Sequence, residues 1–173
     1  MSLECVQVVL SIGSNIDRDA NTRYALKEIR RLYGELDVSP VYETSSVGFD
    51  GPPFFNLIVG FRTNQELQQI IQTLRGIEGG AGRVRAAKTF DSRVLDIDVV
   101  LYGNQNFRDW GINVPRDEIE KYAYVLKPLS DIYPDLIHPI TGITMEQMWQ
   151  QFEIKDQTLF IAEFPLVQRL PTR

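Results

Sequence analysis

Two aspartates separated by one residue lie in the most strand-like segment of the chain, VLDIDVVLY at 94–102. Side chains alternate along a strand, so Asp96 and Asp98 are expected on one face and the apolar residues on the other. Carboxylates at this spacing stand roughly 7 Å apart, which suits one shared cation or two metal ions ~4 Å apart. Magnesium commonly takes one or two protein carboxylates together with substrate phosphates. The spacing alone fits a solvated D-x-D pair equally well.

The segment directly before this strand, residues 83–93, concentrates positive charge in a chain that is acidic overall. Its basic side chains are Arg83, Arg85, Lys88 and Arg93. Arginine binds phosphate through bidentate, charge-assisted hydrogen bonds, and glycines at 79, 80 and 82 would give this loop the freedom that a closing lid needs. Composition alone fits a solvated basic loop. A basic segment that leads into two aspartates, however, indicates magnesium-assisted phosphoryl transfer.

Length and composition limit the class of protein. The chain has 173 residues, 43% of them hydrophobic, which suits a single domain over 1–173. The net charge of −5 argues against a general nucleic-acid binder. No apolar run reaches the ~18 residues of a membrane-spanning helix, and a signal peptide is not apparent. The single cysteine, Cys5, is expected to be a buried strand thiol in a reducing compartment, so a cytoplasmic location is predicted.

Strand and helix patterns alternate along the chain. Runs of β-branched residues predict strands, and apolar residues three and four apart predict helices. Strands are expected at 6–12, 36–43, 54–63 and 94–102, with helices at 17–33 and between Thr63 and the glycines at 79–82. Thr63 and Glu66 have the spacing of a capping box. Short helices near 116–122 and 144–152 and an extra strand within 158–164 are expected to follow.

The order β-α-β-β-α-β defines the expected fold class. It is the ferredoxin-like arrangement of α+β proteins, an antiparallel sheet with helices packed on it. The later segments predict a C-terminal helical extension. Residues 153–173 form a tail whose role the sequence leaves open, as it does the oligomeric state.

Several motifs together give the sequence a specific resemblance. They are LSIGSN (10–15), SPVYETSSVG (39–48), FFN (54–56), GRVRAAKTFDSRVLDIDVVLYG (82–103) and VLKPLSDIYPDLIHPITG (125–142). Over residues 6–150 the chain resembles the 6-hydroxymethyl-7,8-dihydropterin pyrophosphokinases of folate synthesis. This resemblance implies magnesium-dependent transfer of pyrophosphate from ATP to the pterin hydroxymethyl group, with release of AMP.

The resemblance also implies roles for particular residues. The catalytic group would comprise Arg83, Arg93 and Asp98, and two magnesium ions would be ligated by Asp96 and Asp98. The nucleotide would be bound by Glu78, Arg85, Arg93, Val99 and Arg116. The pterin would be bound by Thr44, Val47, Phe54, Asn56, Asp96 and Tyr124, its ring held between Phe54 and Tyr124. Without the resemblance, Glu78 would be interpreted as a solvated helix-end carboxylate, and the lone histidine, His138, is expected to be structural.

Three positions depart from the family pattern and keep other hypotheses open. Arg116 replaces a common histidine, Tyr122 a common basic residue, and Phe90 a common tryptophan. The alternative is a divergent paralogue that acts on a related pterin, or binds pterin with little transfer. The chain lacks the aromatic motif and the basic charge of a ferredoxin-like RNA-binding module. It also lacks the G-x-x-x-x-G-K-[ST] motif of a P-loop kinase. The expected partners are therefore the small molecules pterin and ATP, without nucleic acid or membrane.

Overall fold

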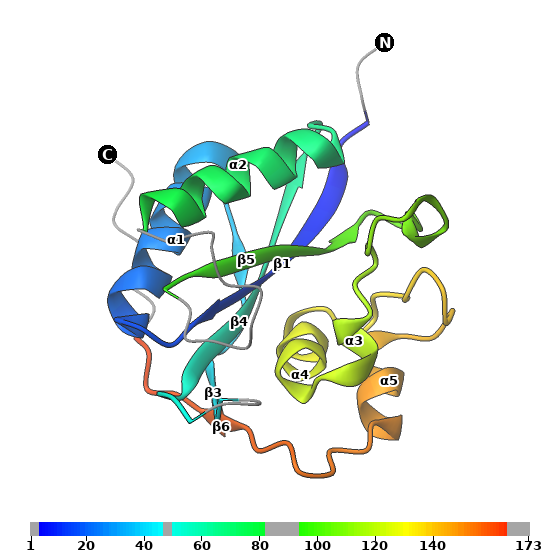
Figure 1. Ribbon diagram of the computed structural model, residues 1–173. Helices are drawn as coiled ribbons and strands as arrows, with labels where there is room; N and C mark the ends of the chain where they lie inside the picture. The colour runs from blue at the N-terminus through cyan, green and yellow to red at the C-terminus, as the bar shows by residue number, and fades with distance from the viewer. Residues whose placement is uncertain (1–3, 47–49, 82–93, 166–173) are drawn as a thin grey trace.

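The computed structural model of the chain describes residues 4–46, 50–81 and 94–165. Its elements form three layers, a central sheet between two groups of helices (Figure 1). In chain order they are β1 (Val6–Ser14), α1 (Arg18–Tyr33), β2 (Asp37–Val38), β3 (Tyr42–Thr44), β4 (Phe54–Thr63), α2 (Leu67–Gly80), β5 (Asp96–Tyr102), the 3-10 helix η1 (Arg108–Trp110), α3 (Glu118–Lys121), α4 (Ala123–Ile132), α5 (Met145–Gln151) and β6 (Phe160–Ile161).

All the named strands join one antiparallel sheet. Its order is β5-β1-β4-β3-β6, and β2 also pairs with β4. Strand β1 lies between β4 and β5 and pairs with both of them. The first and last strands of the βαββαβ unit are thus neighbours, which confirms the ferredoxin-like α+β arrangement predicted from the sequence.

Helices α1 and α2 cover one face of the sheet. Their buried apolar residues recur at helical spacing: Ala25, Leu26 and Ile29 from α1, and Leu67, Ile70, Leu74 and Ile77 from α2. These side chains pack on every second residue of the central strands, such as Leu10, Ile12, Leu57 and Val59. The two periodicities that predicted the elements therefore meet in one core.

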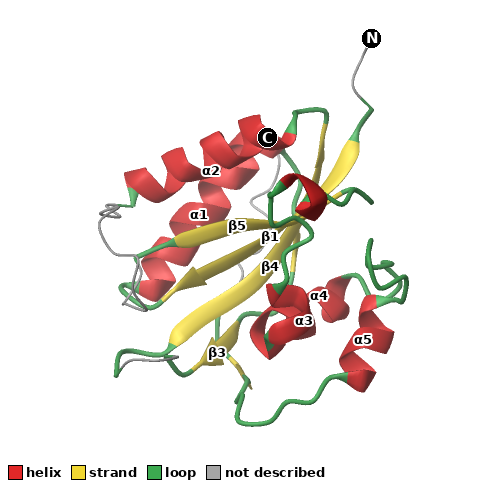
Figure 2. Cartoon of the chain, turned by 45° about the vertical axis from the view of Figure 1, so that its right-hand side comes forward, coloured by secondary structure: helices red, strands yellow, loops and turns green. Residues whose placement is uncertain are grey.

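The C-terminal helices pack on the opposite face (Figure 2). Ile119, Val125, Leu126, Leu129 and Met145 form this second core with Val9, Ile58, Val100 and Leu101. The pairing of β1 with β5 shifts register between Val9 and Leu10, so β5 carries a bulge and both Val100 and Leu101 reach the second core. The predicted C-terminal extension is thus a second helical layer.

Along this second face the strands change from apolar to polar. The change runs from Val9 to Ser11 and Gly13 in β1, from Ile58 to Asn56 in β4, and from Val100 to Asp98 and Asp96 in β5. Residues two apart in a strand share a face. The polar residues therefore lie on the same face as the second core but beyond it, and we call this region the polar end of the sheet.

Some local expectations are corrected. The strand predicted at 36–43 is split into β2 and β3, because the Ser39 hydroxyl accepts the Ile58 N–H at 2.8 Å and Pro40 has no N–H to continue the ladder. The capping box of α2 joins Glu66 to Gln69, whereas Thr63 Oγ1 accepts from Gln65. Cys5 is not the buried strand thiol that was expected, because it is exposed and precedes β1.

Helix α4 is the main element that the sequence pattern did not predict. Pro128 lies inside it, and proline normally interrupts a helix because it lacks an N–H and its ring crowds the preceding turn. Packing of the helix on β4 in the second core outweighs this cost. Across the described ranges, no helix combines the length and apolar character that crossing a membrane requires.

Substitution of Gly60 tests the close approach of the C-terminal end of α4 to β4. A Cβ at Gly60 would lie 1.8 Å from the hydroxyl of Tyr133, which donates to Asp37 Oδ2 at 2.6 Å. Gly60→Ala should displace Tyr133 and lower the free energy of unfolding by about 1–3 kcal/mol. The control Gly76→Ala, where a Cβ meets nothing within 4 Å, should raise it by up to ~1 kcal/mol. Equal effects in urea unfolding would contradict the close approach.

Candidate functional site

One row of paired residues crosses the polar end of the sheet. Gly13 pairs with Asn56 of β4 and with Asp96 of β5, and Tyr42 of β3 pairs with Asn56 on the far side. A Cβ at Gly13 would lie 3.5 Å from Asn56 Oδ1 and 3.9 Å from the Phe54 ring. Glycine therefore leaves room in the middle of a row that joins segments far apart in the sequence.

Three residues predicted to bind pterin come together on β3 and β4. Thr44 pairs with Phe54, and the Asn56 amide donates to Thr44 Oγ1 at 2.8 Å. Asn56 and Thr44 are buried, with exposed fractions of 6% and 8%. The bond fixes which way the amide faces, and a fixed amide presents a defined donor and acceptor to the edge of a heterocycle.

Asp96 and Asp98 lie on one face of β5, as the strand pattern predicts. Burial, together with the nearby Asp96 carboxylate, raises the pKa of Asp98 to about 7, and Arg116 offsets part of this shift. Two carboxylates that oppose each other's ionisation are a fitting donor pair for a divalent cation, which removes their repulsion. Within the described ranges, no group of three or more histidine, cysteine, aspartate or glutamate side chains could hold a metal ion. The remaining ligands would come from phosphate and water.

Arg116 is placed beside the aspartates by the backbone. Its N–H donates to the Val100 carbonyl, at the bulge of β5, at 3.0 Å. Its Nη1 lies 3.7 Å from Asp98 Oδ1, and its Nε donates to Glu118 Oε2 at 2.5 Å. The guanidinium is thus oriented by Glu118 next to Asp98, where it could also meet a phosphate group.

Tyr124, from the first turn of α4, approaches the same region. Its ring stacks on Tyr122, with ring centroids 5.1 Å apart and planes 17° apart. Burial, together with the nearby carboxylates of Glu118 and Asp96, raises the pKa of Tyr124. The second predicted stacking residue therefore lies near the aspartates, and its ring is supported by Tyr122, a contact that the sequence did not indicate.

Glu78 and Val99 belong to the other side of β5. The side chain of Val99 is buried in the core under α1 and α2, so only its backbone is available at the polar end. Glu78 is 8% exposed, and its Oε1 accepts the N–H of Ile97 at 2.7 Å. It is not a solvated helix-end residue, because it fastens α2 to the strand between the two aspartates.

Two further residues, Ser14 and Asn15, hold the strands of the site in place, and the sequence pattern contained them only as part of the LSIGSN motif. Ser14 Oγ donates to the carbonyl of Val94, just before β5, and Asn15 Nδ2 donates to the Pro52 carbonyl at 3.0 Å, just before β4. Both are buried. The end of β1 therefore ties together the chain segments that enter the two strands carrying the candidate residues. The only signal was their place directly after a strand, in a turn-like G-S-N.

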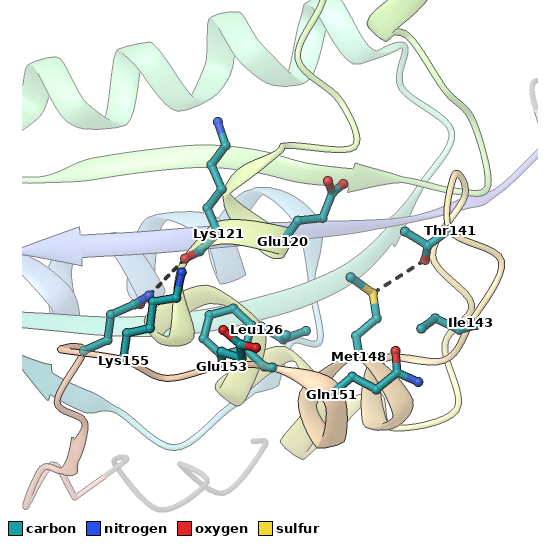
Figure 3. A pocket seen from close by; sticks show the side chains of 11 residues that line it. Glu120, Lys121, Leu126, Thr141, Ile143, Met148, Gln151, Glu153 and Lys155 are labelled. Carbon is teal, nitrogen blue, oxygen red and sulfur yellow. Dashed lines mark hydrogen bonds between the residues drawn. The ribbon is translucent and has the colours of Figure 1, made fainter.

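A separate pocket of about 510 Å³ lies away from the polar end, among α3, α4, α5 and the tail (Figure 3). It combines apolar residues such as Leu126 and Met148 with Lys121 and Glu153 at its wall. Among the predicted site residues that the structure describes, none lines it. His138, fully buried, accepts the N–H groups of Ile140 and Thr141 through Nδ1, which agrees with a structural role.

Comparison with known proteins decides the family. The sequence profile of 7,8-dihydro-6-hydroxymethylpterin-pyrophosphokinase (HPPK) matches residues 9–134, a range that contains every predicted site residue. The chain belongs to the HPPK family. The Val47, Arg83, Arg85 and Arg93 positions, with Lys88 and Phe90, lie outside the described residues, so their roles within this family stay predictions.

Individual relatives agree with the HPPK assignment. The 2-amino-4-hydroxy-6-hydroxymethyldihydropteridine pyrophosphokinase of Aquifex aeolicus is 33% identical, over 77% of this chain and 84% of its own length. The folic acid synthesis protein fol1 of Pneumocystis carinii is 30% identical over 87% of this chain, but this chain spans only 20% of that protein. The solved structure of wild-type Plasmodium falciparum HPPK-DHPS covers 86% of this chain and 45% of its own, with a TM-score of 0.65 and 13% identity. That likeness supports the fold alone.

The bond from Glu78 to β5 can be tested by substitution. Glu78→Leu removes the acceptor of the buried Ile97 N–H, and an unsatisfied buried donor costs about 1–3 kcal/mol. We expect thermal unfolding at a lower temperature and faster hydrogen exchange at Ile97. Glu35→Leu, at an exposed loop position, serves as the control and should change neither. Unchanged exchange at Ile97 in Glu78→Leu would contradict the fastening role.

Proposed function

We propose that the protein transfers pyrophosphate from ATP to 6-hydroxymethyl-7,8-dihydropterin and releases AMP, in a magnesium-dependent step of folate synthesis. The observation that carries the proposal is the row of Asp96, Gly13 and Asn56, which places a carboxylate and a fixed amide on one face of the sheet. Membership of the HPPK family and the name of the A. aeolicus relative support the reaction.

Magnesium fits the donor pair of Asp96 and Asp98, and we assign two ions to it. When bound, the metal would offset the charge of the phosphate groups during transfer. Arg116 would add a second positive group at the same place, held in position by Glu118. We assign nucleotide contacts also to Glu78, Arg85, Arg93 and the backbone of Val99.

The pterin side of the reaction requires that one hydroxyl be held in line with a phosphate. Asn56 and Thr44 would recognise the edge of the ring, and Phe54 and Tyr124 would hold its faces. The hydroxymethyl oxygen then attacks the β-phosphorus of ATP, and the bond from that phosphorus to the oxygen of the α-phosphate breaks. AMP leaves with this oxygen, and the hydroxyl proton passes to solvent water. Arg83 and Arg93 are assigned to neutralise the charge on the transferred group and on AMP.

A divergent paralogue is the second candidate, favoured by two observations. Arg116 is bound to Glu118, and Tyr122 is stacked on Tyr124 in place of a basic side chain. We assign Arg116 to the nucleotide side of the site, whereas Tyr122 lies against the proposed pterin-stacking ring of Tyr124. An assay of AMP release with 6-hydroxymethyl-7,8-dihydropterin and ATP separates the candidates, because the paralogue would bind this pterin without efficient turnover.

Substitution of Asp98 tests the metal-binding pair. Asp98→Asn keeps the size of the side chain but removes its charge, so turnover should fall by at least ~10²-fold, as expected when one electrostatic group at the transition state is lost. Asp109→Asn, at an exposed position in η1, is the matched control and should leave turnover unchanged. Turnover of Asp98→Asn within a few-fold of the parent would contradict the assignment of Asp98 to the metal-binding pair.

Substitution of Tyr124 tests the pterin slot. Tyr124→Ala should weaken binding of the pterin about tenfold or more, because the stacking surface is lost, while binding of a non-hydrolysable ATP analogue changes far less. Calorimetry with each ligand separately measures both constants. Trp110→Ala, a 74% exposed aromatic, is the control. Equal weakening of both ligands would mean that Tyr124 only supports the fold.

A further inference from the structure

The N-terminus of α4 has an unusual cap. Helices usually begin at a residue whose short polar side chain accepts a free N–H of the first turn. Here the N-cap position is Tyr122, which makes no side-chain cap hydrogen bond, and its ring stacks on Tyr124 instead. The turn that carries the proposed stacking residue therefore needs an acceptor from elsewhere in the chain.

Gln157 supplies that acceptor. Its Oε1 accepts the N–H of Ala123 at 2.7 Å, and its Nε2 donates to the carbonyl of Lys121 at 3.0 Å. One amide thus bridges the end of α3 and the start of α4, on both sides of Tyr122. Gln157 also lies outside residues 9–134, the range of the family match.

Gln157 belongs to a segment that is fastened at its other end to the sheet. We call residues 152–165 the strap; Figure 1 shows it leaving α5, passing below α4 and joining β3 through β6. Its Ala162 N–H donates to the Val41 carbonyl at 2.8 Å. Phe164 is buried against Phe55, with ring centroids 5.8 Å apart, and the Arg23 guanidinium lies 4.2 Å from its ring.

The strap contacts both elements that carry the walls of the proposed pterin slot. Gln157 holds the turn that carries Tyr124, and Phe164 packs on Phe55 of β4, on the sheet face covered by α1 and α2 and opposite to Asn56. We propose that Gln157 is a positioning residue for pterin binding, which fixes the Tyr124 ring relative to β4 through the strap. This inference rests on the proposed function, because it takes the pterin as the ligand of Tyr124.

Two variants of Gln157 separate positioning from general stability. Gln157→Met keeps the length of the side chain but leaves the Ala123 N–H without its acceptor. Gln157→Glu keeps an acceptor, and its negative charge suits a helix N-terminus. Gln151→Met, an exposed residue of α5, is the matched control. The readouts are KM for 6-hydroxymethyl-7,8-dihydropterin and for ATP, and amide hydrogen exchange at Ala123.

We expect Gln157→Met to raise KM for the pterin about tenfold, to leave KM for ATP within about twofold, and to speed exchange at Ala123. Gln157→Glu should restore most of the pterin KM, and Gln151→Met should match the parent. Parent-like pterin KM and exchange in Gln157→Met would overturn the inference, as would an equal rise in both KM values. Absence of AMP release by the unsubstituted protein would instead overturn the proposed function, while exchange at Ala123 and calorimetric pterin affinity would still decide the positioning role.

Discussion

Strand β1 pairs with β4 on one side and with β5 on the other, and this double pairing fixes which residues of three distant segments stand in one row. Because side chains alternate, a shift of one residue in either register would turn Asn56 or Asp96 to the face covered by α1 and α2. The apolar residues Leu10, Ile12 and Leu57 prevent such a shift, since they would lose their burial. The hydrophobic core under α1 and α2 therefore determines the geometry of the polar end on the opposite face.

The polar end concentrates charge that the fold must tolerate before any ligand arrives. Asp96 and Asp98 face the same side, and the buried Glu78 adds a third carboxylate beneath them. Arg116 is a neighbouring positive group, and its guanidinium forms ion pairs with both Asp98 and Glu118. Burial and the nearby Asp96 carboxylate raise the pKa of Asp98, and a positive charge beside it would favour its ionised form, as Arg116 does in part.

Local sequence patterns predicted the elements that have one strong periodicity. The strands β1, β4 and β5 and the helices α1 and α2 each carry an uninterrupted apolar pattern, and their order was sufficient to predict the fold. Helix α4 escaped prediction because Pro128 is tolerated only through packing on β4, a contact distant in sequence. The split of β2 from β3 likewise depends on the bond from Ser39 to Ile58.

In the candidate site, too, some residues were predictable from a local pattern and others were not. Strand alternation was enough to place Asp96 and Asp98 together, whereas the approach of Asn56, Thr44 and Tyr124 rested on the family resemblance. The buried place of Glu78 and the support of the Tyr124 turn by Gln157 could not be predicted, because each depends on a hydrogen bond between elements that no local pattern encodes.

The anchoring by Ser14 and Asn15 has a consequence for how such a sequence can diverge. Each residue holds the chain where it enters a strand, at Val94 and at Pro52, and the two attachments use separate side chains. Insertions, deletions and substitutions in either preceding segment can therefore accumulate without moving the row of Asp96, Gly13 and Asn56. Selection for a new nucleotide or a new heterocycle could act on one segment at a time, with the other half of the site inherited unchanged.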